Sequence, residues 1–219
     1  FTLMVIDLWD HIKMIQPIID NLFLKNINYN DPGHAIDIAR ALDALSSDLY
    51  TDSKRFIYEL LQNADDAAFG DSKNQISIDF FDDYMVFAHN GEEFSQRDIE
   101  GLCAVSHGTK KNDKTKTGYK GIGFKSVFGQ SNQVIIYTAG EYFRFDKSFD
   151  FQWNNNWSST QKEWEGNNDR EFIWPWQIIP IYCNKDFIPK KINEYLQKHS
   201  FKVATILKLD YIDKSVVFK

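Results

Sequence analysis

The sequence has little cysteine, no long uncharged apolar run and no surplus of positive charge. Its 219 residues include two cysteines, Cys103 and Cys183, whose spacing fits neither a disulfide framework nor a common metal site. The most apolar stretch, residues 1–24, is interrupted by charged residues and by Pro17, and it has no signal-peptide cleavage site. These absences argue against a membrane-spanning helix and a secreted disulfide-rich domain, and they favour a cytoplasmic protein.

The net charge of −6 argues against direct binding of nucleic acid, although a local basic segment can still hold an anion. A hydrophobic content of 43% with 18 phenylalanines is enough for one sizeable core. Because the chain begins at Phe1 rather than at Met, we expect it to be a piece of a larger protein.

The order of the expected helices and strands along the sequence predicts an α+β fold with a mixed, mostly antiparallel sheet covered by helices. Helices are expected within residues 1–30, 34–49, 53–69, 95–105 and 189–199, and strands within 75–81, 84–89, 134–138, 141–146, 172–182 and 202–210. Asp82-Asp83 and Ala139-Gly140 are expected to turn two hairpins. Residues 147–170, rich in Trp and Asn, resemble a surface insertion, pinned to the core or exposed as a partner surface.

An acid, an amide and a second acid follow one another at helical spacing within residues 53–69. Glu59, Asn63 and Asp66 are four and three residues apart, so they fall within about 60° of one another on a helix. Apolar residues fill the flank of this stripe, and Asp52 or Ser53 could cap the helix start. The pattern indicates a half-buried helix that presents a polar stripe either to a cavity or to solvent.

A glycine-rich turn lies in the most basic stretch of the chain. Gly118, Gly121 and Gly123 would let backbone N–H groups approach a phosphate, and a helix after them would add its positive end. Lys120 and Lys125 are placed to reach phosphates or to remain solvated. A P-loop is disfavoured, because Phe124 interrupts its pattern and no buried strand precedes it. A flexible loop beside solvated lysines is the plainer alternative.

Together the two motifs resemble the ATP site of the GHKL superfamily, and the strings at residues 59–66 and 121–128 are most similar to its sacsin-type branch. The resemblance spans about residues 45–210. It implies a Bergerat-type two-layer α/β sandwich at residues 51–219, with residues 1–50 as an extra N-terminal helical segment packed on the core.

The resemblance also implies roles for individual residues. Glu59 would be the general base that polarises the attacking water, Asn63 would bind Mg²⁺, and Asp66 would lie near the ATP or ADP. The glycines would cradle the phosphates, residues 106–120 would form a lid, and Thr205 would contact adenine through a water. Further nucleotide contacts are expected from Asn90, Gly91, Lys120, Ile122, Phe124 and Lys125.

One position departs from the family pattern. An Asp-x-Gly sequence usually ends the strand after the acid–amide helix, and its Asp accepts from the adenine amino group. Here the stretch is Phe87-Ala88-His89-Asn90-Gly91, so His89 or Asn90 stands at the place of the Asp. Either could accept that hydrogen bond. A metal cluster of His89, Cys103 and His107 matches no common spacing.

Three functions follow. In the first, which the resemblance implies, the chain would be a slow Mg²⁺-dependent ATPase module of a larger, conformationally driven protein, chaperone-like or defence-related. Alternatively it is a nucleotide-binding regulatory module with negligible hydrolysis, or an interaction domain that has lost nucleotide binding. The expected partners are a nucleotide, other domains of the parent protein and a possible second copy of the chain, with no membrane.

Overall fold

The computed structural model describes residues 14–50, 54–68, 74–105 and 123–209. Its helices are α1 (Gln16–Ile27), α2 (Pro32–Tyr50), α3 (Arg55–Asp66), α4 (Gln96–Leu102), α5 (Gln161–Asn168) and α6 (Lys190–Lys198), with 3-10 helices η1 (Gly123–Gly129), η2 (Trp176–Ile178) and η3 (Lys185–Phe187). Its strands are β1 (Ile76–Phe81), β2 (Tyr84–His89), β3 (Gln133–Thr138), β4 (Glu141–Asp146), β5 (Ile181–Cys183) and β6 (Val203–Lys208).

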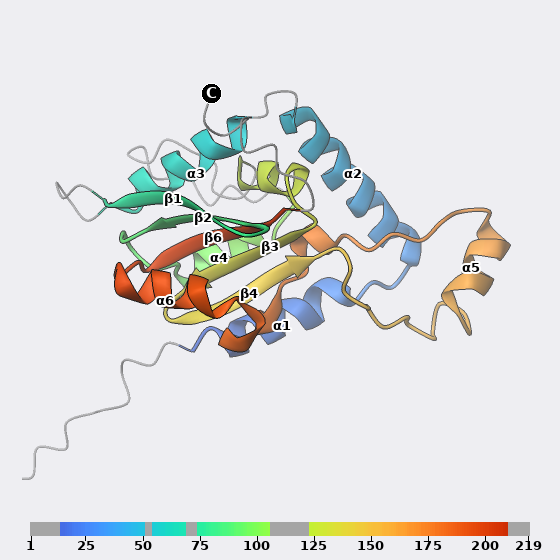
Figure 1. The fold of residues 1–219 in the computed structure, drawn as a ribbon. Helices are drawn as coiled ribbons and strands as arrows, with labels where there is room; N and C mark the ends of the chain where they lie inside the picture. Colours follow the sequence, from blue (N-terminus) through green and yellow to red (C-terminus); the bar gives the residue numbers. More distant parts are fainter. Residues whose placement is uncertain (1–13, 51–53, 69–73, 106–122, 210–219) are drawn as a thin grey trace, which may run out of the picture.

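The strands form one six-stranded sheet in the order β1-β2-β6-β3-β4-β5, in which every neighbouring pair is antiparallel. Both predicted hairpins are confirmed. Asp82 and Ala139 take positive φ angles of 50° and 52° in their turns, a conformation that short polar residues and tight turns tolerate. The α+β class and the α/β sandwich are therefore as the sequence predicts, with helices packed on an antiparallel sheet (Figure 1).

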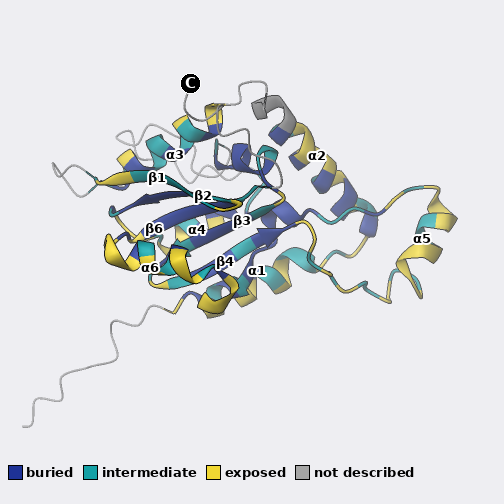
Figure 2. Ribbon diagram, viewed as in Figure 1, coloured by how far each residue is buried: buried dark blue, intermediate teal, exposed yellow. Residues whose placement is uncertain are grey.

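The main core lies between one face of the sheet and helices α1, α3 and α4. Alternation along β2 places Met85 and Phe87 on this face, while Val86 and Ala88 pack on the other face against α6. Figure 1 accordingly shows α4 behind the sheet and α6 in front of it. Figure 2 shows the buried residues concentrated along the strands. None of the described helices is long and apolar enough to cross a membrane.

Residues 147–170 extend away from the sheet and contain the exposed helix α5 (Figures 1 and 2). Aromatic side chains pin this insertion to the start of α2. Trp157 donates its indole N–H to the Tyr29 carbonyl oxygen, and Arg170 pairs with Asp37 at 2.5 Å. Phe172 is buried among four tryptophans, Trp153, Trp157, Trp164 and Trp174. The tryptophans could either anchor the insertion to the core or form an exposed partner surface, and this packing matches anchoring.

Three local predictions differ from the structure. Residues 172–182 contain only the start of the short strand β5, because most of this segment fills the aromatic clusters. The turn after Gly123 is a 3-10 helix rather than an α-helix. Helix α3 has Lys54 at its N-cap with no side-chain cap, while Asp52 and Ser53 lie outside the described residues.

Candidate functional site

The two motifs meet in the structure. Glu59 lies on α3 and Gly123 begins η1, and a β-carbon built on Gly123 would overlap the Glu59 carboxylate, with Oε1 still only 3.1 Å away. Only a glycine therefore fits beside this carboxylate without moving it. The acid–amide helix and the end of the glycine turn thus form a single site.

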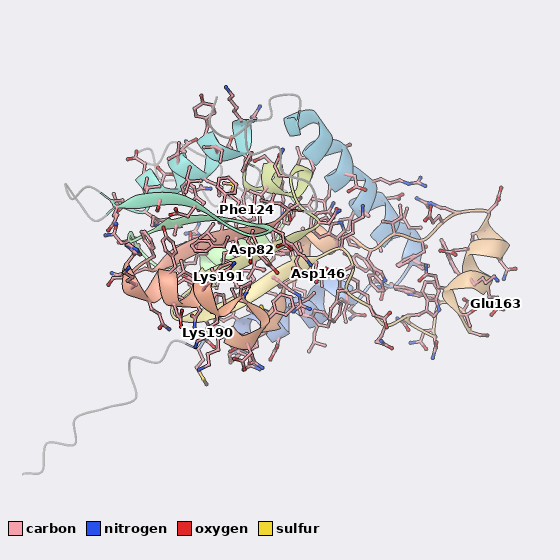
Figure 3. The ribbon with its side chains drawn as sticks, viewed as in Figure 1. Asp82, Phe124, Asp146, Glu163, Lys190 and Lys191 are labelled. Carbon is pink, nitrogen blue, oxygen red and sulfur yellow. The ribbon has the colours of Figure 1, made fainter. Side chains whose placement is uncertain are left out.

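A cavity lies next to this contact, on the face of the sheet that α3 and α4 cover. It is lined by residues from five elements and one loop: Leu60, Asn63, Phe87, His89, Phe94, Asp98, Leu102, Phe124, Val203 and Thr205. Strand register places four of them side by side, since Phe87 pairs with Thr205 and His89 with Val203. Phe124, labelled in Figure 3, comes from η1 and is buried. The cavity is mostly apolar, with a few polar groups, as binding sites for small molecules usually are.

The sequence left His89 and Asn90 as alternatives, and the structure separates them. His89 lines the cavity and is 4% exposed, with its Nδ1 accepting from the Gly91 N–H at 3.2 Å. The Asn90 amide oxygen instead accepts from the Gln75 N–H at 2.8 Å, beside β1. Asn90 therefore closes the strand end, and His89 is the residue at the cavity.

Gly91 holds the strand end against α3. An added β-carbon would lie 2.5 Å from the Ala67 carbonyl oxygen and 2.6 Å from Nδ2 of Asn74. The following N–H, of Glu92, donates to the same Ala67 oxygen at 2.8 Å. This close approach of backbones requires glycine, so Gly91 acts here by packing.

Lys125 occupies a different place from the one expected. It was expected to reach a phosphate, but its side chain is 0% exposed and its Nζ donates to the carbonyl oxygens of Leu102 at 2.5 Å and Gln177 at 3.0 Å. Burial lowers the pKa of Lys125 to about 8. Nearby, burial raises the pKa of the Cys103 thiol to about 12. Lys125 thus ties η1 to the end of α4 and to η2.

The candidate base has a cationic neighbour. Nε of Arg55, one helical turn earlier, lies 3.7 Å from Oε1 of Glu59. The Arg55 side chain is half exposed, so the pair is weak and easily exchanged for another partner. The carboxylate therefore contacts Gly123 on one side and a cation on the other.

The cavity is narrow in this state. The space between its lining side chains is about 30 Å³, which suits one or two water molecules rather than a purine ring. Binding of a base at this place requires its walls to move apart. Phe94 belongs to the loop between β2 and α4, where its N–H donates to the Thr138 hydroxyl.

The structure thus brings Glu59, Asn63, Gly123, Phe124 and Thr205 together with His89. Asp66 lies one turn beyond Asn63 and is not among the cavity residues. Gly118, Lys120, Gly121 and Ile122 lie outside the described residues, as does His107. No three His, Cys, Asp or Glu side chains are grouped as metal ligands within the described ranges.

Sequence reasoning missed Phe94 and Asp98 as cavity residues. The Ser95 hydroxyl oxygen accepts from the Asp98 N–H at 3.2 Å, and Oδ2 of Asp98 accepts from the Ser95 N–H at 3.0 Å, which makes a capping box at the start of α4. The predicted cap at Ser95 is therefore confirmed, and its Ser-x-x-Asp signature was readable in the sequence. That signature marks a helix start and carries no information about the cavity beside it.

Comparison with known proteins finds one matching family model and similar proteins. Residues 45–174 match the family model described as "Sacsin domain". The chain belongs to the sacsin-domain family. This match covers both motifs, the first two hairpins and the insertion that carries the tryptophans.

Two proteins of known sequence are similar to part of this chain. Protein NO VEIN of Arabidopsis thaliana is 38% identical over 112 residues, which is 51% of this chain and 4% of that protein. Sacsin of Homo sapiens is 36% identical over 92 residues, which is 36% of this chain and 2% of that protein. In both relatives, the sacsin-type region that matches is a small part of a much larger protein.

Proposed function

We propose that this domain binds Mg²⁺-ATP and hydrolyses it slowly, as a GHKL-type module of a larger protein that changes conformation. The observation that carries the proposal is the contact between the Glu59 carboxylate and Gly123, beside a cavity lined by Asn63 and Thr205. An acid and an amide on α3 come together there with Gly123, the last glycine of the turn, an arrangement that suits hydrolysis of a phosphoanhydride.

The residues suit these roles chemically. Glu59 can accept a hydrogen bond from a water and orient it, since a carboxylate near the reacting phosphate can act as a general base. Asn63 offers an amide oxygen, a hard ligand that Mg²⁺ accepts. The ion would neutralise charge on the phosphates. Thr205 and His89 lie over the sheet, where the base would bind.

The test is phosphate release from Mg²⁺-ATP by the chain and by Glu59→Gln. Removing a general base should lower turnover by about a hundredfold while nucleotide affinity changes little. Calorimetry on the same samples measures that affinity. Equal, non-zero turnover in the two proteins would exclude Glu59 as the base.

Gly123→Ala is a second probe of the same contact. Its methyl group would displace the Glu59 carboxylate, so turnover should fall about as far as in Glu59→Gln. Gly166→Ala is the matched control, because a β-carbon there would meet nothing within 4 Å. If Gly123→Ala kept wild-type turnover, the carboxylate would not need its present position.

A regulatory module that binds nucleotide with negligible hydrolysis is the second candidate. The position of Arg55 favours it, because a Glu59 carboxylate that faces a cation is less available to orient a water. Tight binding without phosphate release would support this candidate, and a gain of phosphate release in Arg55→Gln would show that the pair suppresses hydrolysis. The parent protein's task, a cytoplasmic location and a homodimer remain predictions.

A further inference from the structure

A second pocket lies where β3 begins and β4 ends, at the opposite end of these strands from their hairpin turn. Its space is about 260 Å³, and every residue that lines it is polar or charged: Asn132, Gln133, Asp146, Lys147, Ser148 and Lys208. Strand register explains this lining, because Gln133 of β3 lies opposite both Lys208 of β6 and Asp146 of β4. Three polar side chains therefore form one row across the sheet, with Asp146 labelled in Figure 3.

This row lies on the face of the sheet that packs against α6. Ile206 and Ile135 precede and follow the row by two residues along β6 and β3, and both belong to the core on that face. Thr205, in contrast, lines the candidate nucleotide cavity. Because side chains alternate along a strand, Lys208 and Thr205 lie on opposite faces. The pocket is therefore separate from the proposed nucleotide site.

The Asp146 carboxylate has its hydrogen-bonding capacity filled from within the chain. Its Oδ2 accepts from Nε2 of Gln133 at 2.8 Å and from Nε of Arg144 at 3.1 Å. Its Oδ1 accepts from the N–H and the hydroxyl of Ser148 at 3.0 and 2.7 Å. Burial would raise the pKa of Asp146, but these hydrogen bonds outweigh it and the pKa is lowered, so the group stays charged. With Arg144 balancing its charge, this carboxylate has little capacity left for a metal ion.

Two ammonium groups then set the charge of the pocket. Lys147 is exposed and Lys208 is partly exposed, and within the described residues neither forms a salt bridge. Since Asp146 is balanced by Arg144, the two lysines leave the lining positively charged in a chain whose net charge is −6. The side-chain amide of Asn132 adds N–H donors. Cationic and neutral donors around one space are what an oxyanion needs.

We propose that this pocket binds a phosphate-type oxyanion, held by the ammonium groups of Lys147 and Lys208 and by the amide of Asn132. The pocket has room for the ion and several waters, since one water needs about 10–15 Å³ of such space. The same chemistry can come from inorganic phosphate or from a phosphorylated side chain of the parent protein. This site goes beyond the proposed function and does not depend on it.

The test is a titration of the chain with inorganic phosphate, followed by nitrogen-15 NMR at an ionic strength held constant with chloride. The backbone amides of Lys147 and Ser148 should shift saturably with a millimolar dissociation constant, as a few partly exposed charge-assisted contacts allow. Lys208→Gln should weaken binding about tenfold, the range of one such contact, and Lys208→Arg should retain it. Lys162→Gln removes the same charge at an exposed position in α5 and should bind as the wild type does.

A parallel titration with O-phosphoserine distinguishes the two sources. Equal shifts with both ligands would show that a phosphorylated side chain fits the pocket. Shifts with inorganic phosphate alone would assign the pocket to the small anion.

Four outcomes would overturn the site. One is the absence of a saturable shift of these amides at up to about 20 mM phosphate. Another is a Lys208→Gln protein that binds phosphate as tightly as the wild type. Chloride alone giving the same shifts would show attraction of anions without recognition of an oxyanion. Shifts confined to amides near Gly123 would assign the phosphate to the nucleotide site instead.

Discussion

Lys125 gives a sharp test of the packing around the second motif. Its ammonium group is fully buried between the carbonyl oxygens of Leu102 and Gln177, with the rings of Phe128 and Phe145 5.3 and 5.9 Å away. Loss of a proton from this group leaves two N–H bonds, enough for both carbonyls. The neutral amine therefore keeps its partners and escapes the penalty of a buried charge.

The sign of the pH dependence follows from the two pKa values. Burial lowers the pKa of Lys125 from 10.5 to about 8, so between these values the unfolded chain holds a proton that the folded chain has released. The free energy of unfolding therefore rises with pH through this window and is flat below it. The full difference corresponds to about 3 kcal/mol, of which about 2 kcal/mol should appear by pH 9.5.

Urea unfolding of the wild type and of Lys125→Met, at pH 7.0 to 9.5 and constant ionic strength, isolates this contribution. Cys103 acts oppositely in both proteins, because its raised pKa costs stability as pH increases, so the comparison uses the difference between the two curves. Lys190→Met is the control, since this lysine is exposed (Figure 3). A wild-type minus Lys125→Met difference that stays constant to within about 0.5 kcal/mol over this range would refute the buried charge.

Three further substitutions test the elements that frame the site. Gly91→Ala should destabilise the fold by about 1–3 kcal/mol in urea unfolding, because its methyl group would meet the Ala67 carbonyl, a backbone group that cannot rotate away. Wild-type stability of this variant would contradict the close contact between Gly91 and Ala67. Trp157→Phe should cost about 1 kcal/mol by losing the hydrogen bond to Tyr29, and protease cleavage of the insertion should become faster if these residues anchor it. Ser95→Ala should cost about 1 kcal/mol by removing the α4 cap, whereas an unchanged unfolding midpoint would show the cap to be dispensable.

The sequence was sufficient for most of the local structure and for one side of the site. Three- and four-residue spacing was enough to place Glu59 and Asn63 on one stripe of α3, since helix geometry is fixed. The hairpin turns at Asp82 and Ala139 were equally readable, because turn chemistry is local. The contact between Glu59 and Gly123 was not readable, since it depends on how α3 and η1 pack across a long sequence separation.

The choice between His89 and Asn90 could not be made from hydrophobic periodicity. A strand with one wet face alternates apolar and polar residues, but β2 is buried on both faces from Met85 to His89. The sequence of β2 therefore does not show which of its residues share a face of the sheet. Pairing with β6, which sets His89 opposite Val203, decides which residue faces the cavity. That pairing belongs to the tertiary structure and cannot be read from the sequence of β2 alone.

The 3-10 geometry of η1 explains why three consecutive residues of the second motif have three different surroundings. A 3-10 helix turns by about 120° per residue, so neighbours in the sequence point in separate directions. Gly123 meets the Glu59 carboxylate, Phe124 lines the cavity, and Lys125 is bonded to the end of α4. Lys125 thereby fixes the rotation of the segment that carries the other two. Under the proposed function, a substitution of Lys125 should therefore change nucleotide affinity and turnover without any contact of its own with the ligand, and Lys125→Met should disturb both more than its effect on stability alone would predict.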